Sequence, residues 1–85
     1  INLMLNIVFK SSIERDLKNI DNHKAIQLIN KIRVNLPSLA LQCKPLKGRF
    51  KDLRRYRIGN YRIIFTVIGN EIIITKIGHR KNVYK

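Results

Sequence analysis

Cationic residues are concentrated in one short stretch of the sequence, which runs from Leu53 to Arg62 and reads LRRYRIGNYR. Four of its ten residues are arginine, and none is acidic. Arginine carries a planar set of N–H donors whose geometry matches the oxygens of a phosphate group. The stretch therefore predicts a binding site for an anion with several oxygens.

The charge of the whole chain favours a nucleic acid as that anion. Eighteen Lys+Arg against five Asp+Glu give 85 residues a net charge of +13. Self-repulsion of this size destabilises the compact state, so we expect an acidic partner. A nucleic-acid backbone fits best, while an anionic surface or an acidic protein would also fit. A highly charged, solvated face without a ligand is the alternative that composition leaves open.

A second basic segment precedes the arginine-rich stretch. The sequence predicts a loop over residues 37–52, because Pro37 disfavours helical geometry at the residue before it. This loop carries four cations: Lys44, Lys47, Arg49 and Lys51.

Other chemistries are not indicated. Cys43 is the only cysteine, which excludes an internal disulfide and suits a reducing compartment. No metal-ligand spacing is visible, and we expect neither a metal nor a cofactor. The longest apolar run, Tyr61–Ile68, contains Arg62 and Thr66 and is far shorter than the ~20 residues of a membrane helix. We therefore expect a cytoplasmic protein that does not contact a membrane.

Two Gly-Asn pairs define the most regular part of the chain. Gly59-Asn60 and Gly69-Asn70 are suited to two-residue hairpin loops, in which glycine supplies the positive φ of a type II′ turn. They predict three antiparallel strands, near 53–58, 61–68 and 71–77.

Two-residue loops fix the register of these strands. Arg57 is then opposite Arg62, Arg55 opposite Ile64, and Ile64 opposite Thr75. One face is predicted to pack against helices and collects Tyr56, Ile58, Tyr61, Ile63, Phe65, Val67, Ile72 and Ile74. The other face is predicted to collect Arg55, Arg57, Arg62, Ile64, Thr66, Ile73, Thr75 and Ile77. The arginines of this second face either bind the anion or extend into solvent with their stems over apolar surface.

The first half of the chain predicts the helices. Alternation over residues 1–9 indicates a strand. Ser11 with Glu14 forms a capping-box pattern that opens a first helix, and Asp21-Asn22 can cap a second. Apolar spacing marks the buried stripes, with Ile13, Leu17 and Ile20 in the first helix and Ala25 or Ile26, Ile29, Ile32 and Leu36 in the second. Pro37 is predicted to end the second helix at Leu36. The order β-α-α-β-β-β predicts one α+β domain over residues 1–85, with a helix hairpin covering one sheet face.

The tail after the last strand has two readings. Gly78-His79-Arg80 and Tyr84 can fold back towards the arginines and add to the site. They can equally form a basic terminus that frays.

These residues carry a resemblance. The segment LKGRFKDLRRYRIGNYRIIFTVIGNEIIITKIGHRKNVY, with SSIERDLKNID before it, resembles the RelE branch of the RelE/ParE toxin superfamily of toxin–antitoxin systems. Its marks are Leu-Lys-Gly before the strands, Tyr-Arg opening the second of them, and Gly-His-Arg-x-x-Val-Tyr at the end. The resemblance implies a ribosome-dependent endoribonuclease that cuts mRNA in the decoding site. In that family the 2′-hydroxyl attacks the adjacent phosphate and leaves a 2′,3′-cyclic phosphate and a 5′-hydroxyl.

The resemblance also implies roles and partners. The catalytic set that it implies is Arg55, Arg57, Arg62, Arg80 and Tyr84. Further RNA contacts are expected from Lys44, Lys47, Arg49, Lys51, Arg54, His79 and Lys81. The implied partners are mRNA, the ribosome and a cognate antitoxin, which the charge of the chain predicts to be acidic.

One departure bears on the chemistry. Some members have lysine where this chain has Arg55, and arginine keeps its proton at any physiological pH. Arg55 and Arg57 are therefore expected to stabilise charge on the phosphate and not to transfer protons. Tyr84 and His79 remain for acid–base work, and neighbouring cations favour tyrosinate over imidazolium. The rival functions are a ParE-like inhibitor of DNA gyrase and a catalytically inactive RNA-binding homologue.

Overall fold

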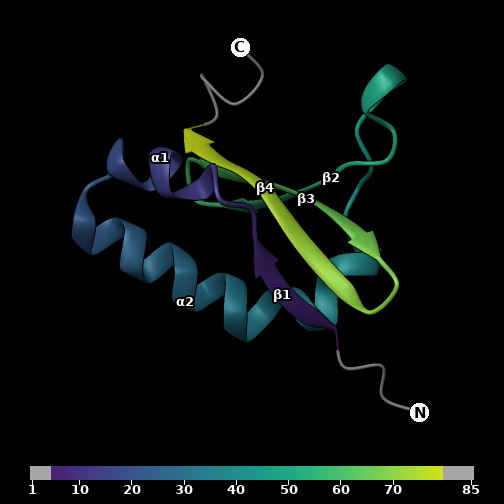
Figure 1. Ribbon diagram of the computed structural model, residues 1–85, viewed down its shortest axis with the longest axis horizontal. Helices are drawn as coiled ribbons and strands as arrows, with labels where there is room; N and C mark the ends of the chain where they lie inside the picture. The colour runs from purple at the N-terminus through teal and green to yellow at the C-terminus, as the bar shows by residue number, and fades with distance from the viewer. Residues whose placement is uncertain (1–4, 80–85) are drawn as a thin grey trace.

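A four-stranded mixed sheet covered on one face by helices forms the protein (Figure 1). The computed structural model describes residues 5–79. In chain order the elements are β1 (Asn6–Phe9), α1 (Ile13–Lys18), α2 (Asn22–Leu39), β2 (Arg54–Ile58), β3 (Tyr61–Ile68) and β4 (Glu71–His79), with short 3₁₀ helices at Ala40–Gln42 and Gly48–Phe50. The strand order is β1-β4-β3-β2. β1 is parallel to β4, and the other pairs are antiparallel. The predicted α+β class and order of elements are confirmed.

The core lies between the helices and one face of the sheet. Phe65, Ile63 and Ile72 are fully buried there against Leu28 and Ile32 of α2. The stripe predicted for α2 was wrong in part. Of the alternatives Ala25 and Ile26, Ala25 is buried and Ile26 is 55% exposed. The prediction missed Leu28, because the buried positions follow the spacing 25, 28, 32 and 36.

Helix ends differ from the predictions at two places. Pro37 does not end α2, which continues to Leu39. A proline this close to the end of a helix removes only one backbone hydrogen bond, and the Ala40 N–H resumes the ladder by donating to the carbonyl of Leu36. The capping box at Ser11 is not formed, because a turn after β1 makes Ser12 the N-cap, without a side-chain hydrogen bond.

Asp21 caps α2 as predicted. Its carboxylate accepts a hydrogen bond from the backbone N–H of Lys24 at 3.4 Å.

The two hairpins follow the predicted geometry. Gly59 has φ 57° and Gly69 has φ 60°, and no residue other than glycine has positive φ in the described part of the chain. Positive φ at the first loop position alone is what a type II′ turn requires. The register confirms Arg57 opposite Arg62 and Arg55 opposite Ile64.

A β-bulge changes the register between β3 and β4. Ile64 lies opposite Lys76 instead of Thr75, and Phe65 lies opposite Ile74. Thr75 is the extra residue, and its hydroxyl donates to the carbonyl of Ile64 at 3.1 Å. Beyond the bulge the two faces of β4 are exchanged, since side chains alternate along a strand.

The predicted face of Ile77 is therefore wrong. Ile77 is 1% exposed and belongs to the core. Lys76 and Gly78 instead occupy the face that carries Arg55 and Arg62.

Candidate functional site

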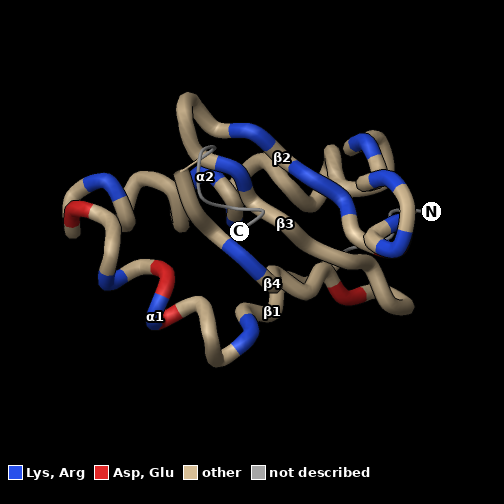
Figure 2. The backbone as a smooth tube through the Cα atoms, turned by 90° about the horizontal axis from the view of Figure 1, so that it is seen from above, with Lys and Arg blue, Asp and Glu red and all other residues tan. Residues whose placement is uncertain are grey.

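Four cations from three strands share the sheet face that turns away from the helices. We call this surface the arginine face and define it by Arg55, Arg57, Arg62 and Lys76. Arg57 of β2 lies opposite Arg62 of β3, which lies opposite Gly78 of β4. In the next row on this face, Arg55 lies opposite Ile64, and Ile64 lies opposite Lys76. Figure 2 shows cationic positions on neighbouring strands of the sheet.

The composition of this face suits an anion. Strands β2, β3 and β4 contain one acidic residue, Glu71, which lies opposite Ile68 at the far end of β3 from Arg62. Gly78, opposite Arg62, contributes no side chain to this face. Arg57 is exposed and Arg62 is half-buried. Arg57 can therefore contact a phosphate from the solvent side while Arg62 contacts the same phosphate from the sheet surface. Directly opposed like charges destabilise a strand pair, and a bound anion offsets this cost.

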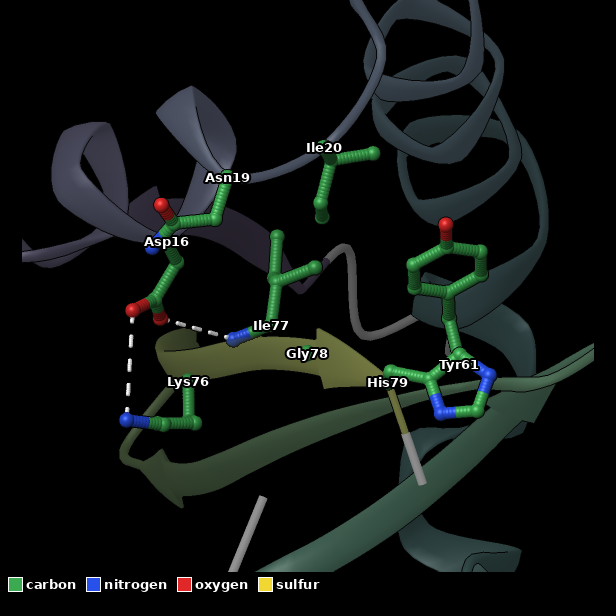
Figure 3. A pocket seen from close by; sticks show the side chains of 8 residues that line it. All are labelled: Asp16, Asn19, Ile20, Tyr61, Lys76, Ile77, Gly78 and His79. Atoms are coloured by element: carbon green, nitrogen blue, oxygen red, sulfur yellow. Dashed lines mark hydrogen bonds and ion pairs between the residues drawn. The ribbon is translucent and has the colours of Figure 1, made fainter. Parts of the chain in front are cut away.

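Lys76 is a cation of the site that sequence reasoning missed. Its Nζ lies 3.9 Å from Oδ1 of Asp16 on α1. The other carboxylate oxygen of Asp16 accepts a hydrogen bond from the backbone N–H of Ile77 at 3.0 Å (Figure 3). β1 pairs with β4 only as far as Ile74, so Asp16 satisfies an edge N–H that no neighbouring strand reaches.

His79 does not face the arginines. The register places it opposite Tyr61, on the sheet face that the helices cover. The two rings meet edge to face with centroids 5.8 Å apart, and Nζ of Lys24 lies 5.8 Å from the Tyr61 centroid. Both rings line a hollow of about 290 Å³ together with Asp16 (Figure 3). Of the two readings of the tail, the one in which His79 turns towards the arginine face does not hold for this residue.

Arg54 was predicted to bind RNA, but the structure gives its guanidinium another role. Its Nη1 donates to the carbonyl oxygens of Cys43 at 2.8 Å and Leu41 at 3.3 Å. Arg54 therefore ties β2 to the segment that follows α2. Burial raises the pKa of the Cys43 thiol, and the nearby Arg54 charge opposes that rise. A thiol in this environment is a weak nucleophile.

The loop before β2 extends the arginine face sideways. The backbone N–H of Arg55 donates to the carbonyl of Lys44 at 3.2 Å, and that of Leu46 donates to Leu53 at 2.8 Å. These bonds bring Lys44 and Lys47 next to Arg55 around a hollow of about 470 Å³. The lining also includes Pro45, Leu46 and Phe50.

Two predicted RNA contacts of this loop lie beside the hollow and not in its lining. Arg49 and Lys51 are both exposed, and the Arg49 guanidinium lies 4.9 Å from the Phe50 ring centroid. Phe50 was not among the predicted residues. The available signal was an aromatic residue between cations in the run Gly48-Arg-Phe-Lys51.

Three predicted site residues lie outside the described residues: Arg80, Lys81 and Tyr84. Within residues 5–79, no group of three or more His, Cys, Asp or Glu side chains could hold a metal ion. None of the helices between Leu5 and His79 is long and apolar enough to cross a membrane.

The sequence has recognisable relatives. A family described as the ParE toxin of type II toxin–antitoxin systems matches residues 7–84. Toxin RelE3 of Methanocaldococcus jannaschii is 36% identical over 85 residues, which cover 94% of this chain and 96% of that protein.

Solved structures agree with these matches. The RelBE2 toxin–antitoxin complex of Mycobacterium tuberculosis contains a chain with a TM-score of 0.82 at 20% identity, covering 89% of this chain and 98% of that one. The RelB–RelE antitoxin–toxin complex of Methanococcus jannaschii contains a chain with a TM-score of 0.61 at 35% identity, covering 91% and 94%. With a family match over nearly its whole length and a relative above one third identity, the chain belongs to the RelE/ParE superfamily of toxins of type II toxin–antitoxin systems.

Proposed function

We propose that the protein is a metal-independent endoribonuclease that cleaves mRNA in the decoding site of the ribosome. The observation that carries this proposal is the pairing of Arg57 with Arg62 across the first hairpin, with Arg55 and Lys76 in the adjacent row. A protein that only bound a nucleic-acid backbone would gain affinity from scattered cations. Several cations on one small face suit a single phosphate on which charge increases during a reaction.

The reaction is an in-line transfer at phosphorus. The 2′-oxygen loses its proton and forms a bond to the adjacent phosphorus atom. The bond from phosphorus to the 5′-oxygen of the next nucleotide breaks, and that oxygen takes up a proton from water. The products carry a 2′,3′-cyclic phosphate and a 5′-hydroxyl.

In this scheme the arginines stabilise the negative charge on the reacting phosphate. Arg57 and Arg62 keep their protons, so they stabilise the extra negative charge of the pentavalent phosphorus without transferring protons. We assign RNA positioning, and the role of a base, to Tyr84, and further phosphate binding to Arg80. The ribosome aligns the 2′-hydroxyl with the leaving oxygen, and such alignment removes a large part of the activation barrier in reactions of this kind.

The antitoxin is proposed to be acidic and amphipathic where it covers the arginine face. Two of the structural relatives are toxin–antitoxin complexes, and a chain of charge +13 favours an acidic partner. The apolar part of this surface is smaller than the sequence predicted. Of the three isoleucines that the sequence placed on this face, Ile64 and Ile77 are buried and Ile73 is half-exposed.

The test is cleavage on ribosomes programmed with a defined mRNA, with the ends of the fragments mapped. We expect cuts in the decoding site with cyclic or 3′-phosphate ends, little cleavage of the same RNA without ribosomes, and loss of cleavage in Arg62→Ala. Fragments with 3′-hydroxyl ends, or equal cleavage of free RNA at the same sites, would contradict the proposal.

A second candidate is inhibition of DNA gyrase. It is favoured by the description of the matching family as the ParE toxin. Its test is a supercoiling assay with purified gyrase, in which the protein is expected to have no effect if it is the proposed nuclease.

A further inference from the structure

Phe50 is an aromatic side chain held on the surface among cations. It is 44% exposed, and the other Phe and Tyr residues between Leu5 and His79 are buried or half-buried. It does not belong to the hydrophobic core or to the residues packed against it. Its neighbours in the chain, Arg49 and Lys51, are exposed cations.

The loop holds this ring in a defined place. Gly48 has φ 66° and opens a single 3₁₀ turn that contains Phe50. The N–H of Phe50 donates to the carbonyl of Lys47 at 3.3 Å, and the carbonyl of Phe50 accepts from the N–H of Leu53 at 2.9 Å. The backbone is therefore hydrogen-bonded on both sides of the ring.

The surroundings of Phe50 match the requirements of a nucleotide. The ring lines the hollow of about 470 Å³ with Lys44, Lys47 and Arg55. Arg55 also belongs to the arginine face, so the hollow and the expected phosphate site are continuous. The combination of a cationic groove with an exposed aromatic ring is typical of single-stranded nucleic-acid binding, in which the groove follows the backbone and bases stack on the ring.

We propose that the Phe50 ring is a stacking platform for an unpaired base of single-stranded RNA whose backbone crosses the arginine face. This inference rests on the proposed function, because it takes RNA as the substrate of that face. Arg49 lies 4.9 Å from the same ring and adds a cation beside the stacked base.

The experiment measures binding of the purified protein to a short, fluorescein-labelled single-stranded RNA by anisotropy. A second probe has the same sugar–phosphate backbone with abasic residues in its central part. Phe50→Ala and Phe50→Leu are expected to weaken binding of the first probe by about 5- to 150-fold, the range for loss of one base–aromatic stack. Phe50→Trp should bind like the wild type, and none of the three changes should alter binding of the abasic probe.

Matched variants separate this inference from the proposed function. Val34→Ala removes another exposed apolar side chain, on α2, and should leave both probes unaffected. Arg57→Ala with Arg62→Ala should weaken both probes equally. The inference is overturned if Phe50→Ala binds the first probe like the wild type, if Phe50→Leu does so, or if the loss is the same for the abasic probe. If any of these results accompanies intact cleavage on ribosomes, the proposed function stands without the stacking platform. Failure of the wild type to bind either probe overturns the stacking platform directly.

Discussion

Replacing Arg57 and Arg62 with alanine, singly and together, tests whether the two guanidinium groups act on one phosphate. Directly opposed residues of an antiparallel pair have Cβ atoms roughly 4.5–5.5 Å apart, and both arginines project from the same sheet face. Two side chains of this length can therefore reach the same phosphate oxygens. Groups that act as a unit give non-additive losses when they are removed one at a time.

The expected magnitudes follow from that geometry. Each single change should slow cleavage by about 10²-fold or more, the scale for loss of one donor to a developing oxyanion. That factor corresponds to about 2.7 kcal/mol of transition-state stabilisation. Independent donors would give about 10⁴-fold in the double variant, whereas a shared phosphate predicts about 10²- to 10³-fold. The coupling free energy is then about 1–3 kcal/mol, in the range measured for residues in contact.

Stability should change little. Removing Arg57 relieves a like-charge cross-strand pair, which is worth about 0.2–1 kcal/mol. Arg57 is exposed, so its removal costs little packing. Arg62 is half-buried, and loss of its stem acts in the opposite direction. For a domain of this size we expect the melting temperature of either variant to stay within about 5 °C of the wild type.

The assay is single-turnover cleavage on programmed ribosomes beside a thermal melt of each variant. Arg15→Ala is the matched control, because it removes an exposed arginine on α1 and so changes net charge equally. Unfolding of either single variant would show that the pair is structural. Full additivity would show that the two arginines contact different phosphates. Unchanged cleavage rates in the single variants would indicate that the phosphate site lies elsewhere, in the loop at 44–51.

Three further outcomes follow from the described contacts. Asp16→Ala leaves the N–H of Ile77 without its acceptor, so it should lower the free energy of unfolding by about 1–3 kcal/mol and speed amide exchange at Ile77. Lys76→Met removes the ion pair but keeps that hydrogen bond, so it should lower stability by less. Equal losses in the two variants would show that the ion pair dominates. Gly59→Ala places a side chain at φ 57°, where its Cβ meets no atom within 4 Å. Backbone strain alone should therefore lower the free energy of unfolding, measured with denaturant, by about 1–2 kcal/mol. An unchanged free energy would mean that the loop has a different conformation. The pH midpoint for alkylation of the Cys43 thiol should be higher in the folded protein than in denaturant, because burial raises the pKa of this thiol. A folded midpoint at or below the midpoint in denaturant would contradict the stated cause.

The register of the first hairpin could be predicted because it depends on local chemistry. Gly59 fixes a two-residue loop, and that loop determines that Arg57 faces Arg62. The N-cap at Asp21 was predictable for the same reason, since the carboxylate and the N–H that it accepts from are three residues apart.

Contacts between distant parts of the chain could not be predicted in this way. The carboxylate of Asp16 reaches the N–H of Ile77 only because β1 lies parallel to β4 and ends at its partner Ile74. No spacing rule relates two residues so far apart in sequence. The hollow beside Phe50 likewise depends on the hydrogen bonds that bring its loop alongside β2.

The bulge at Thr75 shows how the requirements of the core determine the composition of the site. With a regular ladder, Lys76 would lie on the helix-covered face, where an unpaired ammonium group costs several kcal/mol, and Ile77 would lie on the arginine face. The bulge places Ile77 in the core, where full burial of such a side chain contributes about 1.5–3 kcal/mol, and the Thr75 hydroxyl provides a hydrogen bond to Ile64 at the irregularity.

The sequence contains a sign of the bulge, because Lys76 occupies the position that would continue the alternation of Ile72 and Ile74, and Ile77 follows it. Lys76 and Gly78 lie on the arginine face as a consequence of the bulge. Burial of one isoleucine thus decides which groups surround the proposed phosphate site.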